Sequence, residues 1–148
     1  MMRTVVVGLL ALISSSATAQ DSASYAQMAK ASWSAFECSA LAAKLDKDSE
    51  AERLFKLGYD QGKAFISAML DNKVKREDLS DTAPIGVLFR LEGPTPDFML
   101  GRIFESAQDN ALKDVYETMG KFNSDEDQKM LASSKFASSN CQLIGNGR

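Results

Sequence analysis

The chain has 148 residues, 17 Lys and Arg against 20 Asp and Glu, a net charge of −3 and no histidine. This length fits one domain and is too short for two domains of ordinary size. The lack of histidine in the sequence excludes histidine-activated nucleophiles, histidine acid–base catalysis and metal sites that need imidazole, and the acidic charge argues against nucleic acid as a partner.

The first 19 residues have the pattern of a secretory signal peptide. Arg3 supplies a positive start, an apolar run follows over Val5–Ile13, and Ala17-Thr18-Ala19 is the small-residue pattern that precedes a cleavage site. An apolar run this short cannot span a bilayer, which takes about 20 residues. We therefore expect a signal peptide over residues 1–19, cleavage after Ala19, a single helical domain over residues 20–148, and a periplasmic or secreted location.

Two long helices are predicted next. Ser22–Leu45 lacks Gly and Pro, and its apolar residues recur at the three- and four-residue steps of one helical face. A second helix is predicted from about Glu50 to Leu70, started by a capping box over Ser49–Glu52. Gly58 and Gly62 lie four residues apart inside it, and each costs about 1 kcal/mol relative to alanine in a helix interior. We expect them to let another helix approach closely, with the approach of a ligand as the alternative.

A charged connector and a short helix are predicted in the middle of the chain. Asp71–Ala83 is rich in charge and is expected to be the connector. A third helix is predicted over about Pro84–Leu91, capped by Asp81 or Thr82, with its proline in the first turn. This helix is apolar almost all round, which predicts a central, buried position.

Two helices complete the chain. The fourth is capped by Thr95, has Pro96 at its first position and is expected to run to about Met119. The fifth is capped by Ser124, has an acidic first turn and is expected to run to about Asn140. No alternation typical of a strand is found after the signal peptide. The prediction is an all-α fold, a single bundle of about five helices. The residues of the fifth helix expected to face inward are Met130, Leu131, Ala137 and Cys141.

The aromatic-rich helix faces predict one shared core. Exposure of Phe89 and Phe104 together would instead mark them as anchors for a partner. The residues expected in this core are Trp33, Phe36, Phe55, Phe65, Phe89, Ile103 and Phe104.

The two cysteines, Cys38 and Cys141, lie near opposite ends of the predicted domain. An even number of cysteines in an exported chain favours a disulfide. In the chain-entropy model, a bond that closes a loop of about 100 residues stabilises the fold by up to about 4.7 kcal/mol. A reactive thiol is the alternative, but it needs nearby positive charge, and Glu37 precedes Cys38. We predict a structural disulfide that ties the first helix to the last.

No motif in the sequence predicts a catalytic residue, a cofactor site or a metal site. The sequence has no glycine-rich phosphate loop, no GxSxG motif and no EF-hand loop. Paired carboxylates could serve as acid and base in a hydrolase. With 20 acidic residues, however, chance pairs are expected, and helix caps and solvated faces account for several of them. The carboxylates on or near apolar faces are Glu37, Asp60, Glu92, Asp97 and Glu105.

Two segments are candidates for contact with a protein partner. The connector carries a short basic patch, and Gly93–Arg102 combines two stiffening prolines with Gly101 inside the following helix. Rigid presentation reduces the ordering cost of binding. Gly101 is also expected to mark a close helix crossing, and a merely solvated connector is the alternative for the basic patch. The predicted contact residues are Lys73, Lys75, Arg76, Asp97 and Arg102.

This combination of features resembles the small exported immunity proteins of the Tai/Rap group, which protect bacteria from cell-wall amidase toxins of type VI secretion. The features that carry it are the signal peptide, Cys38, the Gly58–Gly62 helix, the capped helix from Thr95 and Cys141, over most of the mature chain. The resemblance implies an all-helical periplasmic protein, often a homodimer, that blocks a toxin's active site with a loop. The same outline is similar to the small acid-stress chaperones of the periplasm, which are helical with one disulfide.

The sequence thus predicts an exported binding protein, an inhibitor or immunity factor against a cell-envelope enzyme. It is expected to have a protein partner, with a homodimer as an option, and no catalytic activity, cofactor, nucleic-acid partner or membrane span. A periplasmic stress chaperone is the first alternative, and a carboxylate-based hydrolase is the second.

Overall fold

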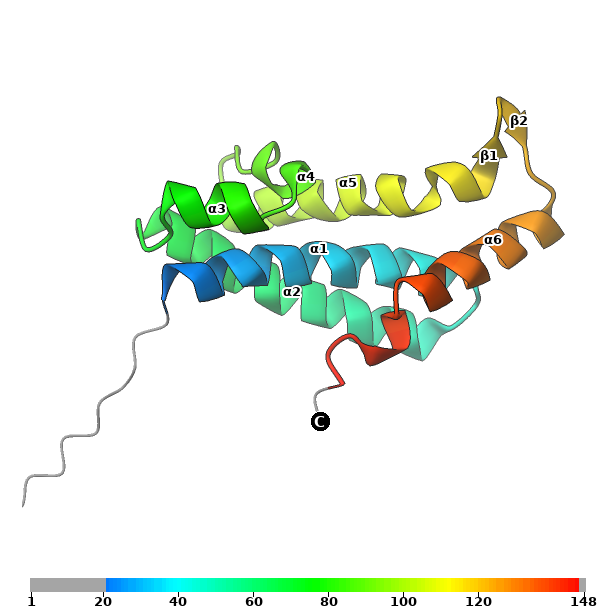
Figure 1. The fold of residues 1–148 in the computed structure, drawn as a ribbon, viewed down its shortest axis with the longest axis horizontal. Helices are drawn as coiled ribbons and strands as arrows, with labels where there is room; N and C mark the ends of the chain where they lie inside the picture. Colours follow the sequence, from blue (N-terminus) through cyan, green and yellow to red (C-terminus); the bar gives the residue numbers. More distant parts are fainter. Residues whose placement is uncertain (1–20, 147–148) are drawn as a thin grey trace, which may run out of the picture.

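The computed structural model describes residues 21–146, so the expected signal peptide lies outside the described residues. The predicted all-α fold is confirmed: the chain forms a packed helical bundle (Figure 1). No helix of residues 21–146 is long and apolar enough to cross a membrane. The elements are α1 (Ser22–Lys44), α2 (Asp48–Leu70), α3 (Arg76–Thr82), α4 (Ile85–Leu88), α5 (Pro96–Tyr116), β1 (Glu117–Thr118), β2 (Lys121–Phe122), α6 (Asp125–Ser138) and the 3-10 helix η1 (Cys141–Leu143).

The three long helices α1, α2 and α5 run side by side along the molecule, with α1 in contact with both others (Figure 1). Gly58 and Gly62 lie on the buried face of α2, where close packing was expected. A Cβ atom on Gly58 would lie 2.6 Å from the Phe36 ring, and one on Gly62 would lie 2.6 Å from the Ser32 Oγ atom. The same Ser32 hydroxyl donates a buried hydrogen bond of 2.7 Å to the carbonyl oxygen of Gly58. The two glycines therefore let α2 pack closely on the core of the bundle.

Gly101 does not mark a close helix crossing, contrary to expectation. It is exposed on α5, and no side chain and no atom of another element lies within 4 Å of the position of a Cβ atom. Helix α5 meets its neighbours through other faces, which carry Leu100 and Ile103.

The core consists of two clusters, and five of the seven residues predicted to share a core lie in or against one of them. One surrounds Phe36, Phe65 and Ile103 between α1, α2 and α5. The other surrounds Leu54, Val115 and the two cysteines and includes α6. Of the residues predicted for the core, Trp33 and Phe104 are half-buried at the edge of the first cluster.

The predicted burial of Phe89 and Phe55 is wrong, since they are 67% and 41% exposed. The third predicted helix forms only the four-residue α4, whose Gly86 lies against the Trp33 indole while Val87 points inward. A single turn cannot bury all its sides, so Phe89 faces solvent.

Several boundaries also differ from the prediction. Helix α2 begins at Asp48, and its N-cap residue, Lys47, makes no side-chain capping bond, so the predicted capping box is wrong. Helix α3 forms inside the expected connector. Thr95 and Ser124 cap α5 and α6 as predicted, accepting hydrogen bonds of 3.2 Å from backbone N–H groups. Met130 and Ala137 of α6 are exposed rather than inward-facing.

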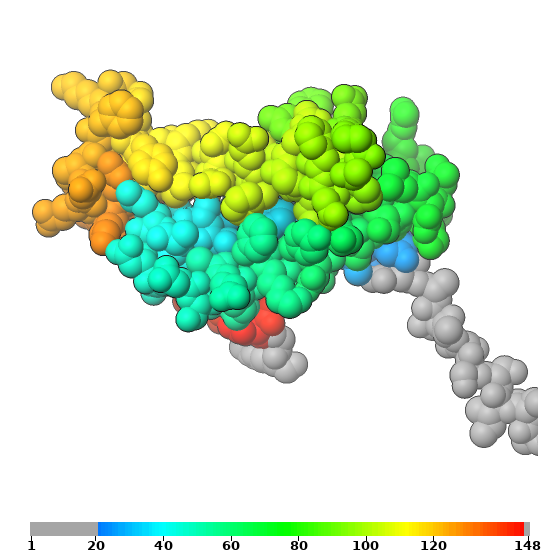
Figure 2. Space-filling model, turned by 180° about the vertical axis from the view of Figure 1, so that it is seen from behind, coloured from blue at the N-terminus to red at the C-terminus, as the bar shows by residue number. Residues whose placement is uncertain are grey.

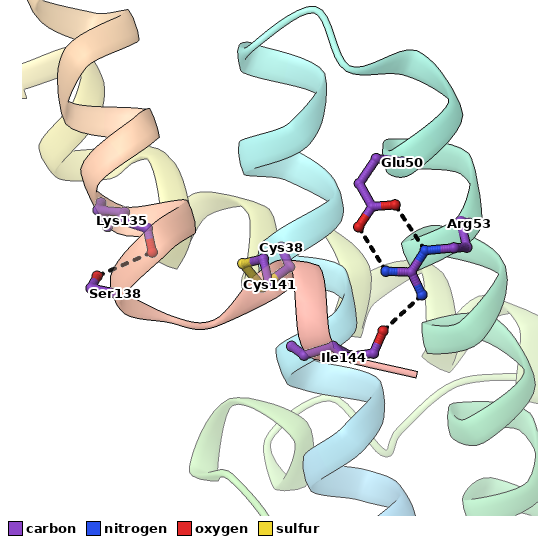
Figure 3. Close-up of a disulfide and its surroundings, with 7 residues drawn as sticks. All are labelled: Cys38, Glu50, Arg53, Lys135, Ser138, Cys141 and Ile144. Atoms are coloured by element: carbon purple, nitrogen blue, oxygen red, sulfur yellow. Dashed lines mark hydrogen bonds and ion pairs between the residues drawn. A yellow bond between two sulfur atoms is a disulfide. The ribbon is translucent and has the colours of Figure 1, made fainter. Parts of the chain in front are cut away.

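The predicted disulfide joins Cys38 of α1 to Cys141 of η1, with 5.4 Å between their Cα atoms (Figure 3). Both cysteines are buried. A second contact reinforces this attachment, because Arg53 of α2 donates 2.7 Å hydrogen bonds to the Ile144 carbonyl oxygen and to the Glu50 carboxylate. The C-terminal segment is thereby held against both α1 and α2.

Candidate functional site

A short β-hairpin extends beyond the end of the bundle, between α5 and α6 (Figure 1). Its strands pair Glu117 with Phe122 and Thr118 with Lys121. The two turn residues, Met119 and Gly120, have φ angles of 53° and 76°. Positive φ at both central residues defines a type I′ turn, whose twist matches that of the paired strands. The hairpin therefore has a regular backbone despite its short length.

The apolar side chains of this hairpin are almost fully in solvent. Met119 is 98% exposed and Phe122 is 83% exposed. In Figure 2 this segment forms a protrusion at one end of the molecule (golden, upper left). Two large apolar side chains with this exposure on one protruding hairpin make it a candidate interaction site.

Met119 is locally unfavourable for folding. The first central position of a type I′ turn favours Asn, Asp and Gly, and a residue with a Cβ atom in the left-handed region costs about 1–2 kcal/mol. With 98% of its surface in solvent, the Met119 side chain gains almost nothing from packing. Neither the conformation of the turn nor packing in the core explains why a methionine stands at this position.

Asn123 clamps the base of the hairpin. Its side-chain N–H group donates hydrogen bonds to the Val115 carbonyl oxygen at 2.9 Å and to the Thr118 hydroxyl at 3.0 Å. Its backbone N–H donates to the Tyr116 carbonyl oxygen at 2.9 Å. These bonds join the end of α5 to the segment that follows the hairpin.

A second layer of contacts connects this clamp to the bundle. Gln128 of α6 is 9% exposed, and its side chain donates to the Asn123 carbonyl oxygen at 2.7 Å. It also accepts a hydrogen bond of 2.6 Å from the Lys44 Nζ atom of α1. The Lys44 Nζ atom lies 4.9 Å from the centre of the Tyr116 ring. The hairpin is thus held by α1, α5 and α6, which pre-organises its tip.

The basic residues predicted to contact a partner lie at the opposite end of the bundle, beside α3 (Figure 1). Lys73 pairs with Asp71 at 2.8 Å, and this hydrogen bond raises the pKa of the Lys73 ammonium. The backbone N–H of Lys75 donates to the Ser22 hydroxyl at 2.7 Å. Lys75 and Arg76 are exposed. Their contact with a partner stays a prediction.

The other two predicted contact residues bond within the chain. Asp97 accepts hydrogen bonds from the Tyr59 hydroxyl at 3.0 Å and from the Lys63 Nζ atom at 3.3 Å, and these bonds hold the pKa of Asp97 below its ordinary value of 3.8. Arg102 donates to the Glu92 carbonyl oxygen at 2.6 Å. These contacts tie the start of α5 to α2 and to the preceding loop.

Four carboxylates are poorly suited to act as general acids. Hydrogen bonds lower the pKa of each of these carboxyl groups. A general acid at neutral pH needs a raised pKa. In the part of the chain that the structure describes, no three His, Cys, Asp or Glu side chains are placed so that they could hold a metal ion together. The four carboxyl groups are those of Asp21, Asp46, Glu50 and Asp97.

A hollow of about 710 Å³ forms an open depression between the α1–α2 loop and the C-terminal segment. Two of its charged residues already have partners inside the chain. Asp46 accepts a 2.6 Å hydrogen bond from Lys129, and the Lys47 Nζ atom lies 5.3 Å from the centre of the Phe136 ring. This depression therefore ranks below the hairpin as a candidate site.

No protein-family model, curated protein or solved structure matches this chain. The resemblance to the Tai/Rap immunity proteins therefore stays a hypothesis, and the candidate site rests on the geometry described above. The hairpin was not predicted from the sequence. Asn-Gly or Asp-Gly is the usual sequence signal of such a turn, and here Met119 stands where the Asn or Asp would be. Gly120, between Thr118-Met119 and Lys121-Phe122, was the one local signal left.

Proposed function

We propose that this protein is an exported binding protein that inhibits a cell-envelope enzyme by placing its hairpin tip in a concave site of that enzyme. The observation that carries the proposal is the exposure of Met119 and Phe122, at 98% and 83%, on a hairpin clamped at its base. A narrow convex element is complementary to a cleft, and active sites of enzymes are concave and largely apolar.

The rigidity of the hairpin supports this role. Binding loses free energy when loops and side chains must be ordered, so an element that is already ordered binds with a smaller loss. Here the bonds of Asn123 and Gln128 supply the order before any partner arrives. The unfavourable Met119 conformation is then explained by contact with a partner, because exposed strain of this kind is concentrated at functional sites.

Export is the second part of the proposal, and the disulfide supports it. Disulfides persist in oxidising compartments, and this one is buried between α1 and η1. Together with the signal-peptide pattern of the first 19 residues, the bond favours a periplasmic or secreted location.

The test compares the parent with the double variant Met119→Asn/Phe122→Thr. Asparagine suits the left-handed turn position and threonine suits a strand, so this variant keeps the hairpin and removes its apolar tip. The tagged domain from Gln20 onward is first used to isolate a partner from the cell envelope, and binding is then measured with both proteins purified. We expect affinity to fall by at least about 30-fold, since a buried anchor in an interface is worth about 2 kcal/mol or more.

Met130→Ser is the matched control. Met130 is also exposed, at 62%, but lies on α6 outside the hairpin. This variant is expected to bind as the parent does. Equal binding by the parent and the double variant would show that the hairpin is not the contact site.

A chaperone is the second candidate, favoured by apolar side chains at the other end of the molecule. Ile85, Phe89 and Phe98 are 63%, 67% and 50% exposed. A holdase chaperone is expected to suppress aggregation of unrelated denatured proteins at about pH 4, where carboxylates begin to lose their charge. An inhibitor is expected to bind its one partner and to leave aggregation unchanged.

A further inference from the structure

Met119, at the tip of the hairpin, is the most exposed methionine of residues 21–146. It is 98% exposed, whereas Met130 is 62% exposed and Met99 is 8% exposed. Met28 and Met69 are partly buried against the core cluster between α1, α2 and α5. A dissolved oxidant must reach a thioether sulfur in order to react with it, so reactivity follows exposure. Of these sulfur atoms, that of Met119 is the easiest to reach.

No thiol competes with the thioethers for an oxidant. The sequence contains two cysteines, Cys38 and Cys141, and both sulfur atoms are bound in the buried disulfide. Thiolates are the usual first targets of a mild oxidant, and a disulfide contains none. In the disulfide-bonded protein, the methionines are therefore the sulfur groups that remain to react.

The position of Met119 allows its oxidation without damage to the fold. Because the residue is 98% exposed, its side chain contributes almost nothing to packing. The hydrogen bonds that hold the hairpin come from Asn123 and Gln128. An oxygen on the Met119 sulfur therefore changes the surface of the tip alone. Met99 is the opposite case, because the same oxygen on its sulfur would be a polar group inside the core.

We propose that Met119 is an oxidation site and that its conversion to methionine sulfoxide turns off binding by the hairpin. The oxidant is a peroxide, with hydrogen peroxide as the probe. The sulfur lone pair attacks one peroxide oxygen, so an S–O bond forms and the O–O bond breaks. The proton of the attacked oxygen passes to the departing hydroxide, which leaves as water. The sulfur gives up two electrons, and these two electrons reduce the peroxide.

The effect on binding rests on the proposed function, whereas the oxidation itself does not. The hairpin is proposed to enter a concave, largely apolar site. A sulfoxide replaces a flexible apolar side chain by a polar one, and burying a polar oxygen without a hydrogen-bond donor is unfavourable. The change is reversible, because a sulfoxide reductase removes the oxygen as water while a dithiol is oxidised to a disulfide.

The first test measures which methionine reacts. The purified, disulfide-bonded protein is treated with dilute hydrogen peroxide and digested with trypsin at successive times. Trypsin cleaves after Lys and Arg, so each methionine of residues 21–146 lies on its own peptide, and mass spectrometry measures the sulfoxide on each. Met119 is expected to react first, at a rate at least about tenfold that of Met99.

Protein unfolded in urea is the control. There the fold no longer shields any sulfur, so the same methionines are expected to react at similar rates. The circular dichroism of folded protein oxidised at Met119 is expected to match that of the untreated protein. Oxidation of another of these methionines as fast as Met119 in the folded protein would overturn the oxidation site.

The second test measures binding to the purified partner that the tagged domain isolates. Peroxide is expected to weaken binding by the parent at least about tenfold, and a methionine sulfoxide reductase is expected to restore it. Met119→Leu has no sulfur at the tip, so its affinities before and after peroxide are expected to be equal, whatever the starting value. Met130→Leu keeps the tip sulfur and is expected to lose affinity as the parent does.

Failure of this switch and failure of the proposed function give different results. If the oxidised parent keeps its affinity while Met119→Asn/Phe122→Thr loses it, the switch is wrong and the proposed function stands. If neither loses affinity, the hairpin is not the contact site and both proposals are wrong. An equal loss of affinity by peroxide-treated Met119→Leu and by the treated parent would assign the effect to another residue and overturn the switch.

Discussion

The glycines inside the long helices differ in whether the packing of the bundle requires the absence of a side chain. At Gly58 and Gly62 the missing side chain is required, because a Cβ atom would overlap Phe36 or Leu100 and Ser32. At Gly101 it is not required, because the described residues leave the space at the Cβ position open. The sequence predicted close packing for all three, since spacing alone cannot tell which face of a helix is covered.

This contrast gives a prediction for the pair Gly101→Ala and Gly58→Ala. The first is expected to raise the free energy of unfolding by up to about 1 kcal/mol, because alanine favours the helix and meets no obstacle. The second is expected to lower it by about 1–3 kcal/mol, because the buried Phe36 ring must move. Urea unfolding followed by circular dichroism measures both values, and a change of the same sign in both variants would contradict the interpretation.

At the scale of elements, the long helices were predictable and the short ones were not. Helices α5 and α6 begin where Thr95 and Ser124 predict, because capping is a local property of the sequence. Which side of α4 is buried could not be predicted, because it depends on the contact between Gly86 and the Trp33 ring. The hairpin escaped prediction because strands of two residues show no alternation.

The clamp of the hairpin yields a prediction for Asn123→Ala. This change removes the hydrogen bonds to Val115 and Thr118, so the hairpin loosens while Met119 and Phe122 remain. Amide hydrogen exchange of Lys121, beside the turn, and of residue 123, whose backbone N–H donates to the Tyr116 carbonyl oxygen, is expected to accelerate about tenfold or more, corresponding to about 1.4 kcal/mol of lost protection. Asn146→Ala is the control, because the Asn146 side chain also donates to a backbone carbonyl oxygen, that of Gln142, outside the hairpin. Unchanged exchange in Asn123→Ala would show that the turn alone keeps the hairpin ordered.

The contact between α2 and α5 predicts a dependence on pH. Because hydrogen bonds from Tyr59 and Lys63 lower the pKa of Asp97 in the folded state, its contribution to stability is present above the ordinary pKa of 3.8 and is lost as the pH falls through the lower folded value. Asp97→Asn keeps an oxygen acceptor but cannot titrate.

Acidification from about pH 6 to about pH 3 is therefore expected to lower the urea midpoint less in Asp97→Asn than in the parent. The other three shifted carboxylates titrate in both proteins, so they cancel in this comparison. Equal losses in the two proteins would show that the Asp97 charge does not stabilise the fold.

At the scale of the whole molecule, the disulfide is the longest-range connection that the sequence predicted. The two bonded residues could be named from the sequence, because the sequence contains two cysteines. The arrangement of two core clusters did not follow, because it depends on how α6 folds back against α1 and α5. The exposed apolar surfaces proposed as contact sites were equally unpredictable, since exposure is a property of the packed bundle.

Replacing both cysteines, as Cys38→Ala/Cys141→Ala, is expected to lower the free energy of unfolding by about 2–5 kcal/mol. The bond closes a loop across a sequence separation of 103 residues, so its loss frees a large part of the unfolded chain. Thermal and urea unfolding measure the change, and the parent under reducing conditions is expected to match the variant. A variant as stable as the oxidised parent would contradict this account.

The position of the two cysteines also sets the order of events in biosynthesis. Cys38 is synthesised before Cys141, which lies 103 positions further along the chain. The bond therefore cannot form until α2, α5 and α6, which lie between the two cysteines, have been made. With two cysteines there is one intramolecular pairing, so no shuffling between wrong bonds inside one chain can occur. The covalent error open to this protein is a cross-link between two copies, and its rate rises with the concentration of chains that carry Cys38 and still lack Cys141.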